Sequence, residues 1–490
     1  MISNPLQIGL EEAGFYLPVT IVVFGASGDL FRKKLLPSLF ALYEAKLLGP
    51  FKLIGVARRF WDTAAFRSEA AKELEKLPAE DPSSHSEFLK QLYFLQTDFN
   101  SAASFKSLKA LIQSDPLIIY YLATPPEAIP VIITALKGNE LAFKQSRIVI
   151  EKPFGHNLAS AQELEKRLKD LFSPEQIFRI DHYLGKETVQ NLLALRFANT
   201  IFEAIWNRNY IERVEITIAE SEGIGNRGLY YEKNGARRDM LQNHLLQLLC
   251  YVAMDKPAAF SPASLVHQKL KVLKALTLPK SRQQPSLVLG QYTAGFIDGQ
   301  AVPGYHAEPQ VAADSRVETY IALLVFIDNS RWRGVPFCLR TGKRLSRRLS
   351  EINLYFKRHT MPAGVFFTSQ PLTNLLCWQL QPEESMRLRF NSKLPGFNQR
   401  LTAVTLNFTY STAFGQHSPT AYERLLLDIF KGDQSLFISA EEVMQSWRFI
   451  AKLERHCQRI TSPLNYPAGS SGPREADLIL KPFQARWKRL

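Results

Sequence analysis

The 490-residue sequence predicts two joined domains. The first, over residues 1–181, is a doubly wound α/β domain, and the second, over residues 182–490, is a larger α+β domain built on a mostly antiparallel sheet with helices. Three observations support this prediction. The chain is too long for a single hydrophobic core. Its first 180 residues alternate short apolar runs with amphipathic stretches, whereas later strands follow one another without intervening helices.

The first domain is predicted from six apolar runs of strand length. Each is rich in β-branched and aromatic residues, and amphipathic segments such as ASAQELEKRLKDLF (159–172) separate several of them. Strands and helices that alternate in this way give a parallel sheet with helices on both faces, as in Rossmann-like domains. The runs are VTIVVF (19–24), FKLIGVA (51–57), LYFLQT (92–97), LIIYYLA (117–123), RIVIE (147–151) and IFRI (177–180).

A change of pattern after Asp181 marks the second domain. HYLGKETVQNLLALRFAN is expected to continue as a helix, and period-2 strands then appear. Helices return at AYERLLLDIF (421–430) and after Ser439, which is expected to form a capping box with Glu442. The strands predict a large antiparallel sheet. The clearest are RVEITIAE (213–220), ETYIALLVF (318–326), EINLYFKRH (351–359), MRLRF (386–390) and VTLNFTY (404–410).

The composition is that of a globular chain and excludes several classes of protein. Hydrophobic residues make up 46% and charged residues 22%, and no window approaches ~18 consecutive apolar residues, so we expect no membrane span or membrane partner. The first basic residue is Arg32, which argues against a signal or transit peptide and favours a cytoplasmic protein. Four scattered cysteines and nine histidines without metal-ligand spacing predict neither disulfides nor a metal site.

The net charge of +14 indicates an anionic partner. Only RTGKRLSRRL (340–349) is densely basic, and the interleaved aromatic residues of a nucleic-acid groove are missing, so nucleic acid is not expected. Phosphorylated metabolites and dinucleotides are the favoured anions.

VTIVVFGASGDLFRKKLL (19–36) is predicted to be a strand, a glycine turn and a helix. Gly25 and Gly28 let the backbone approach a pyrophosphate, which the free N–H groups of the helix can hold. Ser27 and Leu30 stand where a full GxGxxG fingerprint has glycine, so a plain βα turn is the competing interpretation. The position of this segment, in the first βα unit, favours dinucleotide binding.

The end of the second predicted strand indicates which dinucleotide binds. An NAD site places an acid there, whereas an NADP site favours arginine. The strand ends at Arg58 and Arg59, the next acid is Asp62, and Arg32 adds a positive charge nearby. NADP is therefore the predicted cofactor, with ordinary surface arginines as the alternative.

Two more segments follow predicted strands at the same edge of the sheet. YYLATPP (120–126) and EKPFG (151–155) both place proline directly after a strand, where cofactor and substrate should meet. Lys152 is well placed to donate a hydrogen bond to either of them. Sugar oxidoreductases of another Rossmann family carry a similar EKP tripeptide, so this motif alone leaves the substrate open.

A candidate base stands in RRDMLQNHLLQLLCY (237–251), a predicted helix. Hydride transfer from an alcohol leaves a proton to be removed, and the imidazole of His244 suits that task near neutral pH. A core histidine with a satisfied hydrogen bond would give the same pattern. Such a base works best when a carboxylate orients it, and Asp181 is the candidate for that role.

RIDHYLGKE (179–187) gathers donors that suit a phosphate monoester, namely His182, Tyr183 and Lys186. His182 and Lys186 are four residues apart and are expected to share one helical face. Lys343 and Arg348, in the basic stretch, could close around the same anion.

Taken together, these segments make the chain resemble the glucose-6-phosphate dehydrogenase family. GASGDL, EKPFG, RIDHYLGKE, RDMLQNH, LRTGKRLSRR and AYERLLLD occur in that family's order and spacing, from about residue 18 to about residue 485. RIDHYLGKE is the most specific segment. The resemblance implies oxidation of glucose 6-phosphate to 6-phosphoglucono-lactone with hydride transfer to NADP, the first step of the oxidative pentose phosphate pathway. It also implies a homodimer or homotetramer.

The resemblance further implies a role for each matching residue. It implies that His244 takes the C1 hydroxyl proton and that Asp181 completes its dyad. The positions that bind the substrate phosphate match His182, Tyr183, Lys186 and Arg348. Those that bind the sugar hydroxyls match Lys152, Glu220, Asp239, Lys343 and Gln381, and those that bind the cofactor match Gly25, Ser27, Gly28, Arg58, Tyr121 and Lys152.

Two other functions remain as alternatives. A sugar dehydrogenase with an EKP-bearing Rossmann domain that acts on unphosphorylated sugar should lack the paired cationic clusters found here. A catalytically silent nucleotide-sensing module would be expected to have lost His244 or Asp181, and both are present. Some eukaryotic members of the family hold a second, structural NADP through a lysine, but this sequence has Leu349 there, so a second NADP site is not expected.

Overall fold

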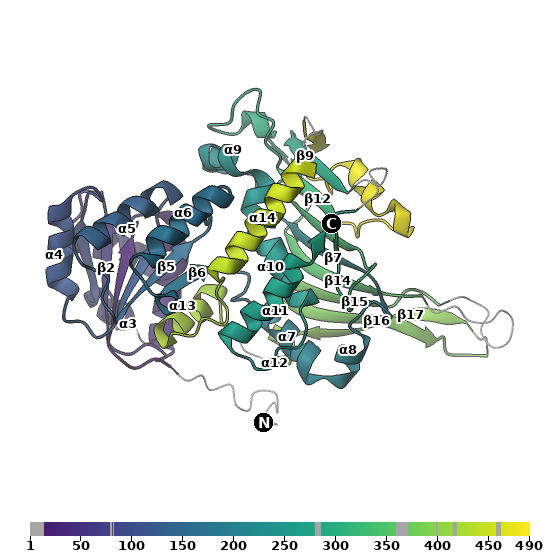
Figure 1. Cartoon of the computed structure of the whole chain (residues 1–490), viewed down its shortest axis with the longest axis horizontal. Coiled ribbons are helices and arrows are strands. Elements are labelled where there is room, and N and C mark those ends of the chain that lie inside the picture. Colours follow the sequence, from purple (N-terminus) through teal and green to yellow (C-terminus); the bar gives the residue numbers. More distant parts are fainter. Residues whose placement is uncertain are drawn as a thin grey trace.

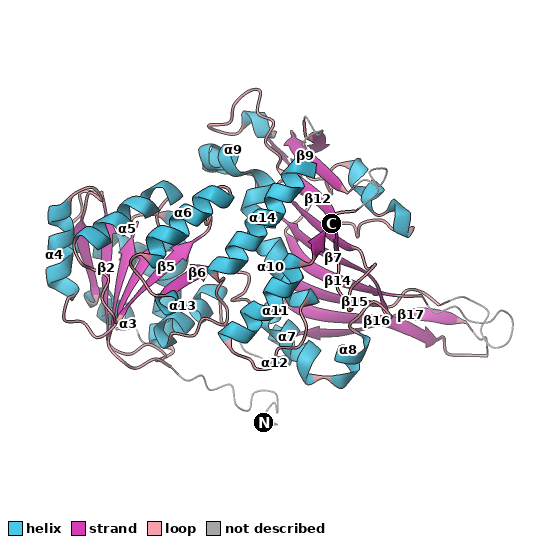
Figure 2. Cartoon of the chain, in the orientation of Figure 1, coloured by secondary structure: helices cyan, strands magenta, loops and turns pink. Residues whose placement is uncertain are grey.

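A computed structural model describes residues 14–78, 81, 83–279, 286–358, 371–397, 400–414, 419–456 and 462–490. The described residues form two large β-sheets that lie side by side, with helices packed around the first sheet and between the two (Figures 1 and 2). The smaller sheet is built from the N-terminal third of the chain, and the larger sheet from the middle and the C-terminal part. This arrangement confirms the predicted fold class.

The N-terminal sheet has six parallel strands in the order β3-β2-β1-β4-β5-β6. Its central strands are buried along almost their whole length, which explains their continuous runs of valine, isoleucine and leucine. The predicted runs match the strands to within one residue at each end. The strands are β1 Val19–Phe24, β2 Phe51–Ala57, β3 Leu92–Gln96, β4 Ile118–Leu122, β5 Ser146–Glu151 and β6 Ile177–Ile180.

Helices cover both faces of this sheet and form its crossovers (Figure 1). The strand order reverses between β1 and β4, which are neighbours in the sheet. Ligands of open α/β sheets bind beyond the carboxyl ends of the strands at such a reversal. The helices are α1 Leu36–Glu44, α2 Thr63–Leu74, α3 Ser84–Lys90, α4 Ala102–Ile112, α5 Ile129–Gly138 and α6 Leu158–Lys169.

The larger sheet follows the order β17-β16-β15-β14-β7-β13-β12-β9-β18, and β8 pairs with β12. Most neighbours are antiparallel, but β13 runs parallel to β7 and β18 runs parallel to β9. The strands are β7 Ile211–Ala219, β8 Leu276–Thr277, β9 Leu287–Thr293, β12 Tyr320–Ile327, β13 Phe337–Gly342, β14 Leu349–Phe356, β15 Leu375–Gln381, β16 Ser385–Lys393, β17 Leu401–Thr409 and β18 Leu464–Pro467. A separate hairpin joins β10 Gly295–Ile297 to β11 Gln300–Val302.

Helices of the second part stand between the two sheets, most visibly α10, α11 and α14 (Figure 2). The segment predicted as one helix around His244 is a π-helical stretch, η6 Arg237–Leu245, followed by α10 Leu246–Ala253. The other helices are α7 Glu187–Ala198, α8 Thr200–Ile205, α9 Gly228–Ala236, α11 Pro262–Lys274, α12 Tyr410–Phe414, α13 Ala421–Lys431 and α14 Ala440–His456.

The prediction that residues 182–186 belong to a helix is wrong. These residues form a turn, and α7 begins at Glu187. The Asp181 carboxylate accepts a hydrogen bond from the Tyr183 N–H at 3.0 Å, and the Asp181 carbonyl accepts one from the Leu184 N–H. This local bonding of an aspartate competes with helix formation. His182 and Lys186 therefore do not share a helical face.

Two C-terminal helices return to the N-terminal sheet. Helix α13 packs against α1, and α14 packs against α6. Arg147, on β5, donates to the carbonyl oxygens of Ile429 and Phe430 at the end of α13. The Trp447 indole N–H donates to the Phe154 carbonyl at 2.9 Å. The N-terminal sheet is thus covered partly by residues that lie more than 240 positions later in the sequence.

Several smaller predictions can also be compared with the structure. The capping box is confirmed, because the N–H of Ser439 donates to the Glu442 carboxylate and the N–H of Glu442 donates to the Ser439 hydroxyl. Cys250, Cys338 and Cys377 are buried free thiols, whereas Cys457 lies outside the described residues. Across the described ranges, no helix combines the length and apolar character needed to cross a bilayer. The domain boundary at residue 181 stays a prediction.

Candidate active site

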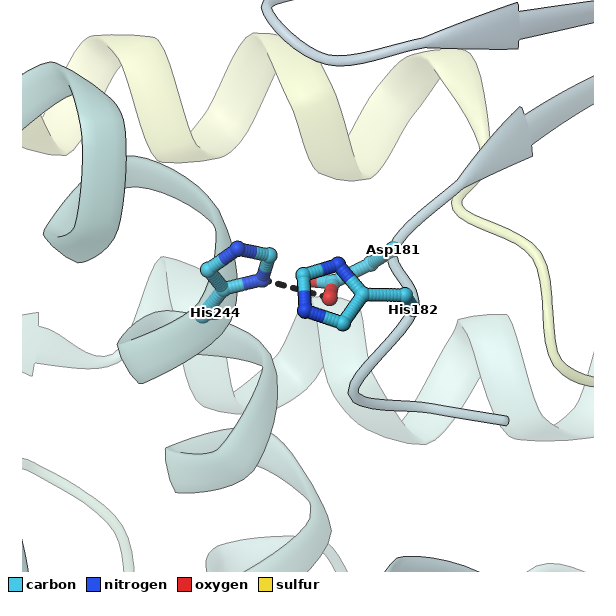
Figure 3. A group of neighbouring side chains, drawn as sticks. All are labelled: Asp181, His182 and His244. Atoms are coloured by element: carbon cyan, nitrogen blue, oxygen red, sulfur yellow. Dashed lines mark hydrogen bonds and ion pairs between the residues drawn. The ribbon is translucent and has the colours of Figure 1, made fainter. Parts of the chain in front are cut away.

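Asp181 and His244 form a buried hydrogen-bonded pair. Asp181 follows β6, at the carboxyl edge of the N-terminal sheet, and His244 projects from the π-helical segment η6 (Figure 3). The His244 Nδ1 atom lies 2.5 Å from the Asp181 Oδ1 atom, and both side chains are 1% exposed. A carboxylate can only accept a hydrogen bond, so Nδ1 carries the proton and Nε2 is left as an acceptor. This is the tautomer that a general base needs.

The surroundings keep this pair in the ionisation state that proton removal requires. Burial lowers the pKa of His244 below its usual 6.5, although the Asp181 charge opposes the shift. For Asp181, burial alone would raise the pKa, but its interactions with His244 and His182 and the hydrogen bond from the Tyr183 N–H outweigh it and lower the pKa. At neutral pH the pair is therefore a neutral imidazole beside an ionised carboxylate.

A pocket of about 710 Å³ opens beside the pair. Four of the predicted substrate-binding residues line it together: His182, Lys186, Arg348 and Gln381. Burial also lowers the pKa of His182 well below 6.5, with His244 as a second cause, so its ring is neutral at neutral pH. Residues from a turn, from the loop before β14 and from the end of β15 thus meet at one cavity. Lys343, which was expected to close around the same anion as Arg348, does not line this cavity and lies beside Glu220 and Asp239 instead.

Lysines of the N-terminal domain also line this pocket. Lys33 and Lys34, from the segment that follows the glycine turn, belong to its wall. Burial, opposed by Glu384 and assisted by Arg348 and Lys34, lowers the pKa of Lys186 to about 8. The sequence analysis did not single out Lys34. The signal was present, since Lys33 and Lys34 lie three and four residues after Leu30, another lining residue, and helical spacing places such residues on one face.

Tyr183 lies behind the pocket and joins its two sides. Its hydroxyl is 3.2 Å from the Ser350 hydroxyl, which in turn donates to the Gln381 side-chain oxygen at 3.3 Å. The Lys186 ammonium lies 5.5 Å from the centre of the Tyr183 ring. Because Tyr183 is buried, its hydrogen bond to Ser350 is strong and helps to fix the positions of Ser350 and Gln381.

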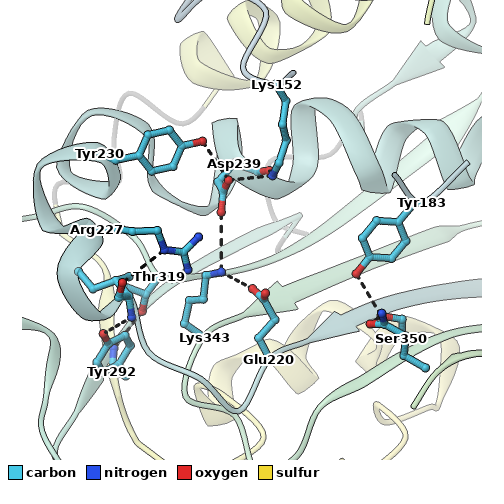
Figure 4. A network of polar contacts seen from close by, with 12 residues as sticks. Lys152, Tyr183, Glu220, Arg227, Tyr230, Asp239, Tyr292, Thr319, Lys343 and Ser350 are labelled. Carbon is cyan, nitrogen blue, oxygen red and sulfur yellow. Dashed lines mark hydrogen bonds and ion pairs between the residues drawn. The ribbon is translucent and has the colours of Figure 1, made fainter. Parts of the chain in front are cut away.

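A second polar cluster centres on Asp239 (Figure 4). Lys152 donates to the Asp239 carboxylate and carbonyl, both at 2.9 Å, and the Tyr230 hydroxyl donates to the carboxylate at 3.2 Å. The Lys343 ammonium pairs with Glu220 and lies 3.8 Å from the other Asp239 oxygen. Burial would raise the pKa of Asp239, but Lys152 and Lys343 outweigh it and lower the pKa. Lys152, Glu220, Asp239 and Lys343, predicted from four distant segments, thus form one network.

The glycine turn has the backbone shape that a pyrophosphate site needs. Gly25 has φ +85°, and a Cβ at this position would lie 2.4 Å from the Ala123 carbonyl oxygen, so only glycine fits. The Gly28 N–H donates to the Gly25 carbonyl, which closes the turn below Ser27. The buried Thr124 hydroxyl at the end of the neighbouring strand β4 has no partner among the described residues. A dinucleotide fits this turn, because its phosphate oxygens can accept hydrogen bonds from groups that have no partner here.

The end of β2 carries the features of an NADP site. Arg58 and Arg59 are exposed there, and Arg59 lies over the Trp61 ring at 5.1 Å. Asp62, the first acid after the strand, accepts from the Ala65 N–H and caps α2. Because its carboxylate is engaged in that cap, it does not fill the place of a ribose-binding acid.

Between the cofactor and substrate regions lie two residues that were not predicted as site residues, Glu151 and Tyr422. Tyr121, on β4, donates to the Glu151 carboxylate at 2.7 Å, and Tyr422, on α13, donates to the same oxygen at 3.1 Å. Glu151 lies within the EKPFG motif, but nothing in the sequence showed that Tyr422, 271 residues away, would reach it.

Asp181, His182 and His244 also form a group whose nitrogen and oxygen atoms lie within 4.8 Å of one another (Figure 3). Such a group could hold a metal ion. The 2.5 Å bond between His244 and Asp181 already uses a ligand atom of each, so we interpret the group as one that handles protons. That the protein needs no metal stays a prediction.

Known proteins match the chain over nearly all its length. The family model described as the NAD binding domain of glucose-6-phosphate dehydrogenase matches residues 22–191, and that of its C-terminal domain matches residues 193–488. The chain belongs to the glucose-6-phosphate dehydrogenase family.

Individual members of this family give the same result. The glucose-6-phosphate 1-dehydrogenase of Chlamydia pneumoniae is 40% identical, with 98% of each chain covered. Glucose-6-phosphate 1-dehydrogenase 2 of Mycobacterium bovis is 42% identical over 96% of this chain and 95% of its own. A solved glucose-6-phosphate dehydrogenase in complex with glucose 6-phosphate superposes with a TM-score of 0.88 and 35% identity, covering 98% of this chain and 100% of that one. The alternative of an EKP-type dehydrogenase for unphosphorylated sugars is not favoured.

Proposed function

We propose that Asp181 and His244 remove the C1 hydroxyl proton of glucose 6-phosphate while C1 delivers a hydride to NADP. The reaction follows from the family, whose members in this comparison are named glucose-6-phosphate 1-dehydrogenases, and the choice of NADP rests on Arg58 and Arg59 at the end of β2. The observation that carries the proposal is the 2.5 Å bond of the buried pair, next in the chain to His182, which lines a pocket with Lys33, Lys34, Lys186 and Arg348.

In this mechanism His244 Nε2 accepts the hydroxyl proton as the C1–O bond gains double-bond character. The electron pair of the C1–H bond leaves with its hydrogen, and the products are the lactone and an imidazolium. Bound NADP supplies the hydride acceptor. The Asp181 carboxylate stabilises the imidazolium and holds the ring in the required tautomer. The buried setting strengthens this attraction, because it is weakly screened by water.

The pocket lined by His182, Lys186 and Arg348 would hold the substrate phosphate, with Tyr183 behind it. Arg348 is exposed and can fold over a bound anion, whereas Lys186 is half-buried. A dianionic phosphate would raise the pKa of Lys186 back toward its usual value, since it adds negative charge to that of Glu384. Lys34 adds a further cation from the N-terminal domain.

The network around Asp239 would bind the sugar hydroxyls. Ionised carboxylates accept from hydroxyl groups and the two ammonium groups donate to them, so the cluster can fix the ring orientation. We assign Lys152, Glu220, Asp239, Lys343 and Gln381 to this role. Gly25, Ser27, Gly28, Arg58 and Tyr121 would bind NADP, and Lys152 borders both ligands.

A homodimer or homotetramer, a cytoplasmic location and a domain boundary at residue 181 belong to the same proposal. They rest on the family resemblance and on the pattern of the sequence.

One assay tests the central proposal. NADP and NAD reduction are followed at 340 nm with glucose 6-phosphate and with glucose, for the wild type and for His244→Asn. We expect efficient turnover with glucose 6-phosphate and NADP, and a loss of at least ~10²-fold in kcat for His244→Asn. Asparagine still hydrogen-bonds the C1 hydroxyl, so substrate affinity should stay near normal. A His244→Asn enzyme with near wild-type kcat would end the proposed mechanism.

A further inference from the structure

Glu151 is a carboxylate with an unusual place in the site. It ends β5, next to β4, in the half of the sheet where the nicotinamide end of a dinucleotide lies. The hydroxyls of Tyr121 and Tyr422 both donate to its Oε1 atom. Lys152, the next residue, directs its ammonium to Asp239 instead. Glu151 takes no part in the proton transfer by His244 and Asp181.

The two tyrosines connect Glu151 to both ligand regions. Tyr121 is one of the predicted cofactor-binding residues. Tyr422 lines the phosphate pocket, and its ring lies nearly parallel to the His182 ring, at 12° and 6.3 Å between centres. A carboxylate held between these rings stands at the boundary where the reacting carbon and the nicotinamide should meet.

From this position we propose that the Glu151 carboxylate makes the site prefer the oxidised nicotinamide over the reduced one. The oxidised ring carries a positive charge and the reduced ring carries none, so a nearby negative charge favours binding of the oxidised form. The proposal rests on the proposed function, because it assumes that NADP binds along the β4–β5 edge.

The preference should depend on pH, because Glu151 changes its charge near neutrality. Burial raises its pKa, the two tyrosine hydroxyls and the Lys152 charge oppose this rise, and the Asp181 charge adds to it; together they bring the pKa to about 7. These groups come from each neighbouring element: Tyr121 from β4, Tyr422 from α13, Lys152 from the following loop and Asp181 from the end of β6. Above pH 7 the carboxylate is charged and the preference is present; below pH 7 it is protonated and the preference is lost.

Binding measurements with Glu151→Gln test this. Glutamine can still accept both tyrosine hydrogen bonds, so the substitution removes the charge with little change of shape. NADPH binding is followed by its fluorescence, and NADP binding by displacement of NADPH, without substrate. At pH 8.5 the wild type should favour NADP over NADPH by roughly tenfold more than the variant does, the effect expected of one charge about 12 Å away at an effective dielectric constant of about 20. At pH 5.8 the two proteins should give nearly the same ratio.

Two features of this design isolate Glu151. Both cofactor forms carry the same 2′-phosphate, so its titration cancels from the ratio. Protonation of His182 or His244 affects both proteins alike and cancels between them. Glu140→Gln is the matched control, because Glu140 lies in the same domain in an exposed ion pair with Lys109. It should leave the ratio unchanged at both pH values.

Tyr422→Phe gives a second test if Glu151→Gln folds poorly. It removes one hydrogen bond to the carboxylate and keeps the ring against His182, so the pKa of Glu151 should rise and the pH of the switch should move upward. A ratio that is identical in wild type and Glu151→Gln at pH 8.5, or a switch that Tyr422→Phe leaves in place, would overturn the inference. If that happens while glucose 6-phosphate still reduces NADP, the proposed function stands and only the role of Glu151 falls.

Discussion

Replacing Asp181 with asparagine tests how the buried pair works. In the transition state the carboxylate faces an imidazolium, and the 2.5 Å separation of Nδ1 and Oδ1 places the two charges close together. Unit charges about 4 Å apart at an effective dielectric constant of about 20 attract by ~4 kcal/mol. Since each ~1.4 kcal/mol is a factor of ten, Asp181→Asn should lower kcat by about 10³-fold.

The same substitution should move the pH profile in a definite direction. The base works only when His244 is neutral, so kcat/KM falls as the pH drops through the pKa of His244. The Asp181 charge raises that pKa. Asp181→Asn should therefore shift the acid limb of the profile to lower pH while it lowers the plateau, with the KM for glucose 6-phosphate changed only a few-fold.

Steady-state kinetics between pH 5 and 9 check both effects. The double variant with His244→Asn should lose much less than the product of the two single losses, because a dyad acts as a unit. An Asp181→Asn enzyme within tenfold of the wild-type kcat, or one whose acid limb moves to higher pH, would refute the reasoning.

Three further outcomes are expected. Arg58→Ala should weaken NADP binding by ~1.5–3 kcal/mol and leave NAD binding nearly unchanged; equal losses, measured by fluorescence titration, would contradict the assignment. Lys186→Ala should raise the KM for glucose 6-phosphate far more than it changes activity on glucose, and a comparable loss in steady-state assays of both sugars would show that Lys186 does not contact the phosphate. Glu442→Gln should lower the free energy of unfolding by about 3–5 kcal/mol, because it leaves the buried Lys269 ammonium, now 2.7 Å from the carboxylate, without an opposite charge. Denaturant unfolding checks this against Glu441→Gln, which removes a neighbouring but exposed ion pair and should have little effect.

The N-terminal sheet could be predicted well from the sequence because its strands are buried on both faces. A strand such as β1 then appears as an uninterrupted apolar run between turn residues, and its ends are easy to place. Strand β13 is also buried along its whole length but was missed, because its residues do not form an apolar run. It contains the buried Arg340 and ends in the basic stretch 340–349, so its composition favours a charged loop over a strand. Strand β15 was missed because neighbours on both sides bury it without a clear alternation.

The candidate site could be predicted in part. The residues that carry recognisable chemistry, such as Asp181, His244 and Lys186, stand in segments whose patterns are specific. Glu151 and Tyr422 could not be predicted as partners, because only the packing of α13 against the first domain brings them together. The turn at residues 182–186 was mistaken for a helix because the four-residue spacing of His182 and Lys186 fits a helix. The hydrogen bond from the Tyr183 N–H to the Asp181 side chain, which competes with the helix, produces no periodicity in the sequence.

The return of α13 and α14 to the first domain has a consequence for how the protein is made. Strand β6 ends at Ile180, but α13 begins only at Ala421. At a synthesis rate of about 5–20 residues per second, those intervening residues take roughly 12–50 s to emerge from a ribosome. During that interval the carboxyl side of β6 lacks the groups that later cover it, including the Phe437 ring against Phe178 and the Ile438 backbone that Arg179 contacts.

The apolar surface beside β6 of the nascent N-terminal domain therefore stays uncovered until α13 and α14 have been synthesised. A ribosome that stalls between residues 200 and 420 would leave that surface open to chaperones or to other nascent chains. A premature stop shortly before residue 421 would release a polypeptide with the glycine turn, the dyad and most of the phosphate pocket already translated. Its first domain would lack the α13 and α14 contacts that complete it.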